Sequence, residues 1–290
     1  MKDKKGLEKI HLFFLVGAQK SGSTWLQKSL NSIHGFHCLG EGHFIDKFLI
    51  PIAQTRHEYN KMMKIVNERV YEGNGFYKEI PSEEFIEYMR SWIFDMMLRN
   101  CNQSIGSVYA LGDKTPANSF HIRTLKILFP DCKFIHLLRD GRDACVSAYY
   151  HRKRILEKNG QQSKNIDELA PQLLSKWAEF TKSVLDAEKS GINMCTVRYE
   201  DMLVDNLAVL RQCINHIMPE NQVSDIELQE SIRANSFTKM TGGRKSGEVQ
   251  NESFVRRGQS GSWKDELQET TQNSFNQDDI DLLKKLGYIC

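Results

Sequence analysis

The sequence of 290 residues lacks several features, and each absence excludes a class of protein. It has almost as many acidic as basic residues, 37 against 39, so the formal net charge is only +2. A chain without a basic excess is not expected to bind nucleic acid. Long apolar runs are missing too. The run after the charged N-terminus covers only residues 11–16, too short for a secretory leader or a transmembrane segment.

Paired cysteines are also absent. The seven cysteines are scattered along the chain and form no CxxC motif. An odd, dispersed set is typical of reduced thiols inside a cell and not of a disulfide framework. Hydrophobic residues make up 40% of the chain and charged residues 26%, as in ordinary globular domains. We therefore expect a cytoplasmic protein that folds as a single domain over residues 1–290.

Four short apolar runs have the composition of buried parallel strands, with many β-branched or aromatic residues and a polar or glycine-containing turn after each. They cover residues 11–16, 107–112, 133–138 and 193–198. Between them, apolar residues recur at spacings of three and four, which predicts helices that include Trp25, Phe85 and Leu173. This alternation predicts an α/β fold with a central parallel β-sheet flanked by helices. The polar, glycine-rich residues 241–262 are interpreted as a mobile lid loop.

The first run leads into GAQKSGSTW, residues 17–25, in which Gly17 and Gly22 have the spacing of the phosphate-binding GxxxxGK[ST] loop. Ser23 occupies the position of the lysine in that motif, and Lys20 lies two residues before the second glycine. A glycine loop between a strand and a helix directs backbone N–H groups and the positive helix end at an anion. Hydroxyl donors for that anion come from Ser21, Ser23 and Thr24. The loop alone does not distinguish a nucleoside triphosphatase from other anion-binding proteins.

Two later segments carry further candidate anion ligands. Arg139 follows the third apolar run, and Ser147 lies eight residues further on a predicted helix. A guanidinium binds phosphate oxygens in a bidentate way, so an arginine and a nearby hydroxyl make a phosphate clamp. In FVRRGQSGSWK, a second candidate clamp consists of Arg256, Arg257 and the backbone of Gly258. Each segment taken alone is equally well interpreted as a solvated basic helix or a charged loop.

Together and in this order, the motifs resemble the signature set of sulfotransferases, which take a sulfuryl group from 3′-phosphoadenosine 5′-phosphosulfate (PAPS). The family's loop typically reads KSGTTW, against KSGSTW here, and its late motif reads RKGxxGxWK, against RRGQSGSWK. Tyr199 in VRYEDM and Phe237 in NSFTKM stand where the family contacts adenine, and Trp25 matches its other adenine-stacking residue. The matches extend from residue 13 to residue 264. The resemblance implies a P-loop-like sulfotransferase fold.

The resemblance also gives a role to the displaced lysine. A sulfuryl group in transfer carries less negative charge than a phosphoryl group, so no divalent metal need bridge it. Lys20 is then placed to neutralise the leaving 5′-phosphate while the S–O bond breaks. The 3′-phosphate would be held by Arg139, Ser147, Arg256 and Arg257. The product is 3′,5′-adenosine bisphosphate (PAP), and the expected reaction requires no metal.

The acceptor, a hydroxyl or an amine, loses a proton as it attacks sulfur, so a base is needed. CLGEGHF offers Glu41 and His43, and it resembles the EVHFF-like segment of the carbohydrate and heparan branch, whose glutamate is the base. GDKTPANSF resembles a second segment of that branch, which makes Lys114 a candidate to orient the acceptor or support the transition state. Small-molecule, lipid and carbohydrate acceptors all stay open. The sequence does not indicate an oligomeric state.

Two other classes of protein stay open at this point. A metal-dependent P-loop kinase would use Asp113 and Asp140 as candidate Mg²⁺ ligands, although the GK pair of such kinases is missing. A non-catalytic relative would bind PAPS or PAP without turnover. The intact Lys20 and the candidate base favour an enzyme over that second class.

Overall fold

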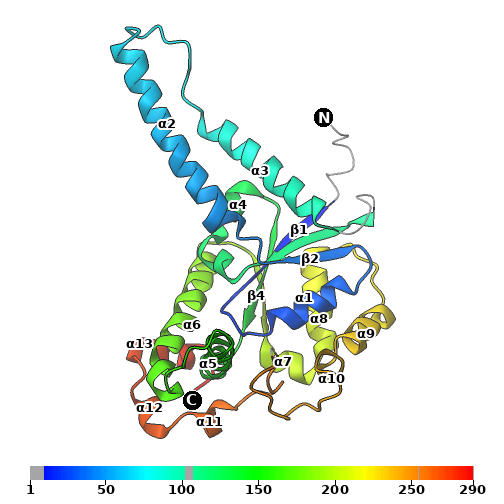
Figure 1. Ribbon diagram of the computed structural model, residues 1–290. Coiled ribbons are helices and arrows are strands. Elements are labelled where there is room, and N and C mark those ends of the chain that lie inside the picture. The colour runs from blue at the N-terminus through cyan, green and yellow to red at the C-terminus, as the bar shows by residue number, and fades with distance from the viewer. Residues whose placement is uncertain (1–9, 102–106, 254, 290) are drawn as a thin grey trace.

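The computed structural model describes residues 10–101, 107–253 and 255–289. At its centre lies a five-stranded parallel sheet in the order β2-β3-β1-β4-β5, with helices on both faces (Figure 1). The strands are β1 (His11–Val16), β2 (Phe36–Gly40), β3 (Ala110–Lys114), β4 (Lys133–Leu138) and β5 (Met194–Arg198). The predicted α/β fold with a central parallel sheet is confirmed.

The strands follow the predicted runs closely, with one addition. β1 and β4 have the predicted bounds, and β5 begins one residue later than expected. β3 is shifted toward the C-terminus, so Asp113 and Lys114 are its last two residues and not part of the following turn. The sequence does not indicate β2, which lies at the edge of the sheet next to β3. Its buried and partly exposed residues alternate, so FHCLG contains no continuous apolar run.

Helices cover the sheet in two layers. Because side chains alternate along a strand, Phe13 faces one buried cluster and Phe14 faces the cluster on the opposite side. The first cluster includes residues from α1 (Ser23–Asn31), α8 (Asn206–Ile217) and α9 (Asp225–Ala234). The second includes residues from α3 (Ser82–Arg99), α4 (Ile122–Leu128) and α6 (Ile166–Lys189). A third cluster joins α6 to α5 (Gly141–Lys158) and α13 (Gln277–Lys285).

Shorter helical segments connect these elements. They are η2 (Phe44–Leu49), η4 (Pro116–Phe120), α7 (Tyr199–Val204), α10 (Phe237–Met240), α11 (Trp263–Glu266) and α12 (Glu269–Asn273). The helices expected around Trp25, Phe85 and Leu173 are present as α1, α3 and α6. The extent of a single domain over residues 1–290 stays a prediction.

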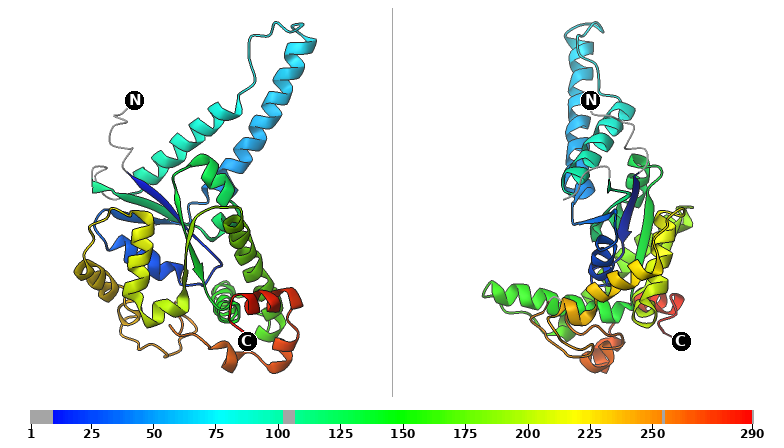
Figure 2. Two further views of the ribbon diagram at one scale, coloured as in Figure 1. Left: turned by 180° about the vertical axis from the view of Figure 1, so that it is seen from behind. Right: turned by 90° about the vertical axis from the view of Figure 1, so that its right-hand side faces the viewer.

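The helix α2 (Ile50–Arg69) and the helix α3 form a hairpin that projects from the body of the molecule (Figure 1, Figure 2). None of the residues of α2 is buried. The C-terminal part of α3 reaches the core through Ile93, Met97 and Leu98. Across the described residues, no helix is both long enough and apolar enough to cross a membrane.

Candidate active site

The carboxyl ends of the parallel strands meet at one edge of the sheet, where a cavity of about 480 Å³ opens. Each strand, or the segment directly after it, contributes one of the lining residues Lys20, Glu41, Lys114, Arg139 and Tyr199. Ligands of open α/β sheets bind at this edge, and the volume is in the range of small-molecule sites. The cavity is lined by all of the predicted site residues except Ser21 and His43.

The glycine loop presents an uncapped helix end to the cavity. Gly22 precedes α1 with φ 95, and a Cβ at this position would lie 2.7 Å from the Tyr199 ring. Only glycine fits both the conformation and the space. α1 has no side-chain cap and no acidic residue in its first turn. Its N-terminal N–H groups therefore favour an anion, and Ser23 and Thr24 add hydroxyls at the same wall. Ser21 is fully buried instead.

Both the backbone conformation and the positive charge of Lys20 are unfavourable in this loop. Its φ of 67 lies in the left-handed region, which is uncommon for a residue with a Cβ. Its pKa is lowered from 10.5 to about 8, first by burial and then by the charges of Arg154, Arg139 and Lys114. Such a cation is stabilised when an anion binds beside it, so Lys20 is suited to an anionic ligand.

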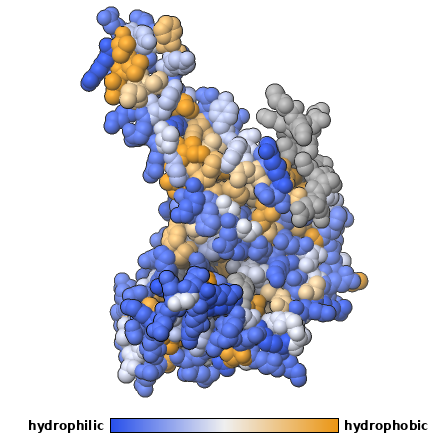
Figure 3. Space-filling model, viewed as in Figure 1, coloured by the Kyte–Doolittle hydropathy of each residue, from blue (hydrophilic) through white to orange (hydrophobic). Residues whose placement is uncertain are grey.

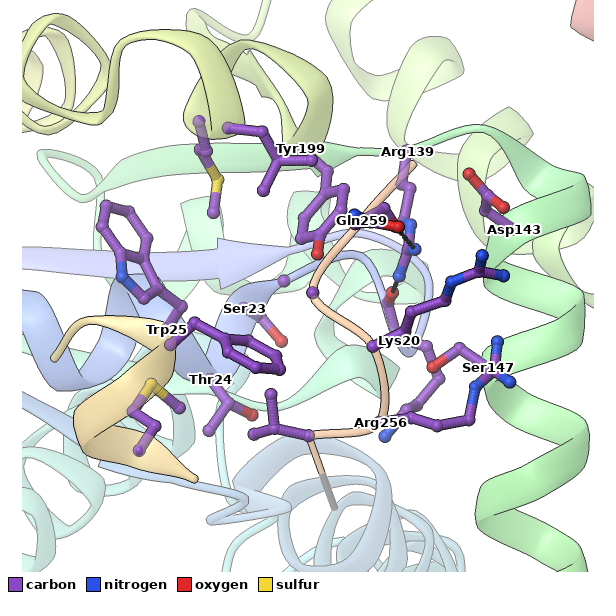
Figure 4. A pocket seen from close by; sticks show the side chains of 18 of the residues that line it. Lys20, Ser23, Thr24, Trp25, Arg139, Asp143, Ser147, Tyr199, Arg256 and Gln259 are labelled. Atoms are coloured by element: carbon purple, nitrogen blue, oxygen red, sulfur yellow. Dashed lines mark hydrogen bonds between the residues drawn. The ribbon is translucent and has the colours of Figure 1, made fainter. Parts of the chain in front are cut away.

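Arg139 connects three parts of the cavity. Its guanidinium lies 4.0 Å from the centre of the Tyr199 ring. It donates to the carbonyl oxygens of Lys20 and Gln259, each at 3.0 Å (Figure 4). Its Nε is buried and has no hydrogen-bond partner among the described residues. Ser147 of α5 lines the same wall, so the predicted arginine and hydroxyl are brought together.

The late motif reaches the cavity with its arginines already paired. Arg256 makes a bidentate ion pair with Glu266, at 3.0 Å and 2.6 Å. Arg257 is less tightly held, with Nη2 at 3.5 Å from the Asp265 carboxylate. Both arginines line the cavity. An incoming anion would compete with these carboxylates, so the two arginines are not equivalent, and their predicted role as phosphate ligands stays a prediction.

Asp143, in the first turn of α5, anchors the late motif. The sequence does not distinguish it from an ordinary acidic residue at the start of a helix. Its nearly buried carboxylate accepts four hydrogen bonds from residues 260–263. The donors are the hydroxyls of Ser260 and Ser262, each at 3.1 Å, and the N–H groups of Gly261 at 2.6 Å and Trp263 at 3.1 Å. Hydrogen bonds to an ionised group are stronger than neutral ones. Asp143 therefore fixes the position of the loop that carries Arg256.

The predicted lid contains neither helix nor strand in the part of residues 241–262 that the structure describes. Arg244 donates to the carbonyl oxygens of Glu248, at 3.1 Å, and Arg256, at 2.8 Å. These bonds fold the segment back on itself, and Asp143 attaches its end to α5. The mobility of the segment stays a prediction.

The cavity also has apolar lining residues, which are Trp25, Met202, Leu203, Phe237 and Met240. Gly258 packs against the Phe237 ring so closely that a Cβ there would lie 2.3 Å from it. Figure 4 shows Trp25 across the cavity from Lys20 and Arg256. A ligand that combines an aromatic ring with anionic groups matches this division.

At the rim, Glu41 and Lys114 form an ion pair, with Nζ 2.8 Å from Oε1. The Lys114 side chain is only 10% exposed, whereas that of Glu41 is 55% exposed. Glu41 has φ 48, so like Lys20 it is a strained residue at this edge, where such residues often serve function. His43 is directed elsewhere. Its Nδ1 lies 3.1 Å from both carboxylate oxygens of Asp46, and it does not line the cavity.

His151 lines the cavity, although its sequence context did not require this. It follows Ser147 by four residues, which places both on one face of α5. Its Nδ1 lies 3.0 Å from Nη2 of Arg154, and because a guanidinium only donates, this nitrogen accepts and Nε2 carries the proton. Burial, then Lys20 and Arg154, lowers the His151 pKa to about 4. At neutral pH it is an uncharged donor and not a base.

Asp113 and Asp140, the candidate Mg²⁺ ligands of a metal-dependent kinase, form hydrogen bonds and an ion pair with other residues. Asp113 is fully buried and accepts from Thr115 at 2.6 Å, Asn118 at 3.0 Å and the Gly42 N–H at 3.1 Å. Asp140 caps α5 and pairs with Arg142 at 2.7 Å. Neither aspartate lines the cavity. The predicted use of these two residues as Mg²⁺ ligands is therefore not supported.

The glycine loop after β1 and the uncapped start of α1 have the arrangement of a P-loop-like anion site. Sequence comparison narrows the class: residues 13–218 match the Sulfotransferase family, and the chain belongs to that family. It is 27% identical over 239 residues to omega-hydroxy-beta-dihydromenaquinone-9 sulfotransferase Stf3 of Mycobacterium bovis and to its namesake in Mycobacterium tuberculosis. The match covers 70% of this chain but only 62% of those relatives, so the chain spans less than two thirds of their length.

Two solved structures share the fold. Mouse sulfotransferase SULT7A1, complexed with PAP, superimposes with a TM-score of 0.51 at 16% identity, over 95% of this chain and 82% of its own. The sulfotransferase domain of the Synechococcus PCC 7002 olefin synthase gives 0.55 at 17% identity, over 96% and 95%. The expected sulfotransferase fold is confirmed, and the kinase alternative is not.

Proposed function

We propose that this chain transfers a sulfuryl group from PAPS to the hydroxyl or amine of an acceptor and releases PAP. The observation that carries the proposal is the distribution of groups in one cavity. Cationic side chains gather at one end, Trp25 lies at the other, and an exposed carboxylate stands at the rim. Family membership supports the same reaction.

The residues of the cavity fit the donor. The uncapped end of α1, with Lys20, Ser23 and Thr24, would hold the 5′-phosphate. The buried Nε of Arg139 lacks a partner among the described residues, and an anion beside Ser147 would satisfy it. These two residues, with Arg257 and Arg256, would hold the 3′-phosphate. The adenine would lie against Trp25, Tyr199 and Phe237. When bound, PAPS supplies the sulfuryl group.

Glu41 is the base in this proposal. Its carboxylate is exposed at the rim, and Lys114 fixes it through Oε1. Lys114 also places a positive charge where the acceptor would lie. Of the two histidines considered, His43 is paired with Asp46 away from the cavity, and His151 holds its proton on the nitrogen that is not bonded to Arg154. Only Glu41 combines access with an available lone pair.

We further infer an apolar alcohol, such as a lipid, as the acceptor class. Stf3, by its name, acts on a menaquinone derivative. In this chain the segment after Glu41 leads directly into apolar residues of η2, where Phe48 stacks on Trp92 of α3 with ring centres 3.9 Å apart. We also propose that the enzyme works in the cytoplasm, because the described cysteines are free thiols, as in a reducing compartment.

Isothermal titration with PAP, AMP and ATP-Mg²⁺ tests the donor class. The contacts to the 3′-phosphate are charged hydrogen bonds of about 1.5–3 kcal/mol each, so we expect PAP to bind at least tenfold more tightly than AMP, with or without chelator. Binding of PAP no tighter than that of ATP-Mg²⁺ would refute the proposal. Transfer of labelled sulfate from PAPS to long-chain and short-chain alcohols then tests turnover. Tight PAP binding without transfer to any acceptor would identify a non-catalytic relative.

A further inference from the structure

The α2–α3 hairpin ends in an apolar tip, residues 70–77. Its side chains Val70, Tyr71, Phe76 and Tyr77 are 65%, 41%, 83% and 72% exposed. The rings of Tyr71 and Phe76 meet edge to face, with centres 5.5 Å apart. Figure 3 shows apolar residues at this tip and along the hairpin toward the body. Contiguous exposed apolar residues of this kind mark an interaction site in soluble proteins.

Polar bonds, and not the tip residues, hold the hairpin in shape. Arg56 of α2 donates to the Ile80 carbonyl at 2.9 Å and 2.7 Å. Asn60 exchanges two hydrogen bonds with the backbone of Ile80, at 2.9 Å and 2.8 Å, and Asn67 donates to the Tyr77 carbonyl at 2.9 Å. These bonds hold the segment between α2 and α3 against α2, although α2 has no buried residue. The apolar side chains of the tip make none of these bonds, and their exposure calls for a partner.

We propose that the hairpin tip docks into the interfacial region of a lipid membrane. Tyrosine and phenylalanine are the side chains that enter this region, because they combine a large apolar ring with, in tyrosine, a polar end. The tip by itself is also smaller than a standard protein interface. Its three aromatic side chains have about 150–250 Å² each and are already partly covered, against about 800 Å² per partner in a stable protein interface.

The charge around the tip decides which membrane it fits. Residues 61–79 contain four basic and three acidic side chains, so the region is nearly neutral. Attraction to anionic lipids requires a cluster of basic residues, which this segment lacks. The docking is therefore driven by the apolar side chains. It tolerates high salt and does not depend on anionic lipid.

Docking at the tip would place the apolar surface of the hairpin between the bilayer and the body of the protein. The hairpin follows η2, which begins a few residues after Glu41, and α2 rises about 30 Å over its 20 residues. A lipid acceptor leaving the bilayer would meet the apolar surface of the hairpin before reaching the rim. This part of the inference rests on the proposed function, whereas docking itself does not.

Vesicle flotation tests the docking. The full chain is mixed with phosphatidylcholine vesicles, with and without phosphatidylserine, at low and high salt. We expect the protein to float with both vesicle types at both salt concentrations. The variant Phe76→Ser/Tyr77→Ser should bind at least tenfold more weakly. A matched control is Ile127→Ser/Ile226→Ser, which removes side chains that are 59% and 71% exposed on the body, and it should bind like the natural sequence.

A second measurement reports which residue enters the lipid. Brominated phosphatidylcholine should quench the added tryptophan of Phe76→Trp and not that of Ile226→Trp. Absence of flotation, or equal loss in the tip and control variants, would overturn the proposal. So would a dimer, seen by sedimentation equilibrium, that becomes monomeric in the tip variant, because the partner would then be a second copy. PAP binding and sulfation of a soluble alcohol are measured on the same samples. Vesicle binding without sulfation would overturn only the proposed function, and sulfation without vesicle binding only the docking.

Discussion

The carboxyl edge of the sheet and the α2–α3 hairpin are joined by residues 41–49, yet different interactions stabilise them. At the edge, charged side chains are buried and paired, as in the bidentate Arg256–Glu266 pair and the four bonds to Asp143. In the hairpin, α2 has no buried residue, and side chains such as Arg56 bond to backbone carbonyls in partly exposed positions. Buried charge pairs are costly to disturb, whereas exposed ones contribute little.

This difference has a functional consequence. A donor with two phosphates binds more tightly where the loops of the site are already positioned, as by the four bonds to Asp143, since reorganising many groups upon binding would lower the affinity. A bulky apolar acceptor needs an accessible surface from which it can dissociate after the reaction. We therefore expect mutations at the edge to change catalysis and donor affinity strongly, and mutations in the hairpin to act locally.

The largest effect is expected at the junction of the two regions. Glu41→Gln removes the proposed base but keeps the size of the side chain, so kcat should fall by about 10²–10⁴ while the Kd for PAP stays unchanged. Sulfation assays and titration calorimetry measure both quantities. His43→Gln serves as the control, because His43 pairs with Asp46 outside the cavity. A larger loss in the control than in Glu41→Gln would assign the base to His43.

The next largest effect concerns the loop that Asp143 anchors at the carboxyl edge of the sheet. Asp143→Ala removes the acceptor of four hydrogen bonds, so the loop with Arg256 loses its fixed position and the KM for PAPS should rise about 10- to 100-fold. At saturating donor, kcat should change little. Asp167→Ala is a matched control, since Asp167 anchors residues 268–271 outside the cavity through bonds from Gln268 and Thr271. Equal effects of both variants on the KM would show that Asp143 acts only through overall stability.

These residues show where the sequence is informative. Continuous apolar runs predicted β1 and β4, because strands buried on both faces leave no polar position. The edge strand β2 alternates and gave no such signal. In the site, ordered motifs predicted Lys20 and Arg139, and both line the cavity. Asp143 was missed because its bonding partners lie more than 100 residues away, and no local pattern reports such a contact.

A smaller effect concerns pH. Because the pKa of Lys20 is lowered to about 8, its ammonium is mostly charged at pH 7 and mostly neutral at pH 9. PAP stays fully ionised in this range, and its binding favours the charged lysine. The affinity for PAP should therefore be highest near pH 7 and fall by up to about tenfold per pH unit above 8. Calorimetry between pH 6.5 and 9.5 measures this slope. Lys20→Arg should abolish it, and an unchanged slope in that variant would assign the titration to another group.

The smallest effect is expected in the hairpin itself. Arg56→Ala removes the bonds to the Ile80 carbonyl and to the Ser82 hydroxyl, the latter at 3.0 Å. Because α2 contributes no buried residue to the core, the melting temperature should change by no more than about 1–2 °C. Amide hydrogen exchange in residues 70–82 should instead become at least several-fold faster, since these bonds hold that segment. Arg211→Ala, which removes an arginine bonded to Val223 and Asp225 on the body, should leave exchange in the hairpin unchanged. A cooperative loss of global stability in Arg56→Ala would mean that the hairpin is part of the folding core, and the contrast between the two regions would then not hold.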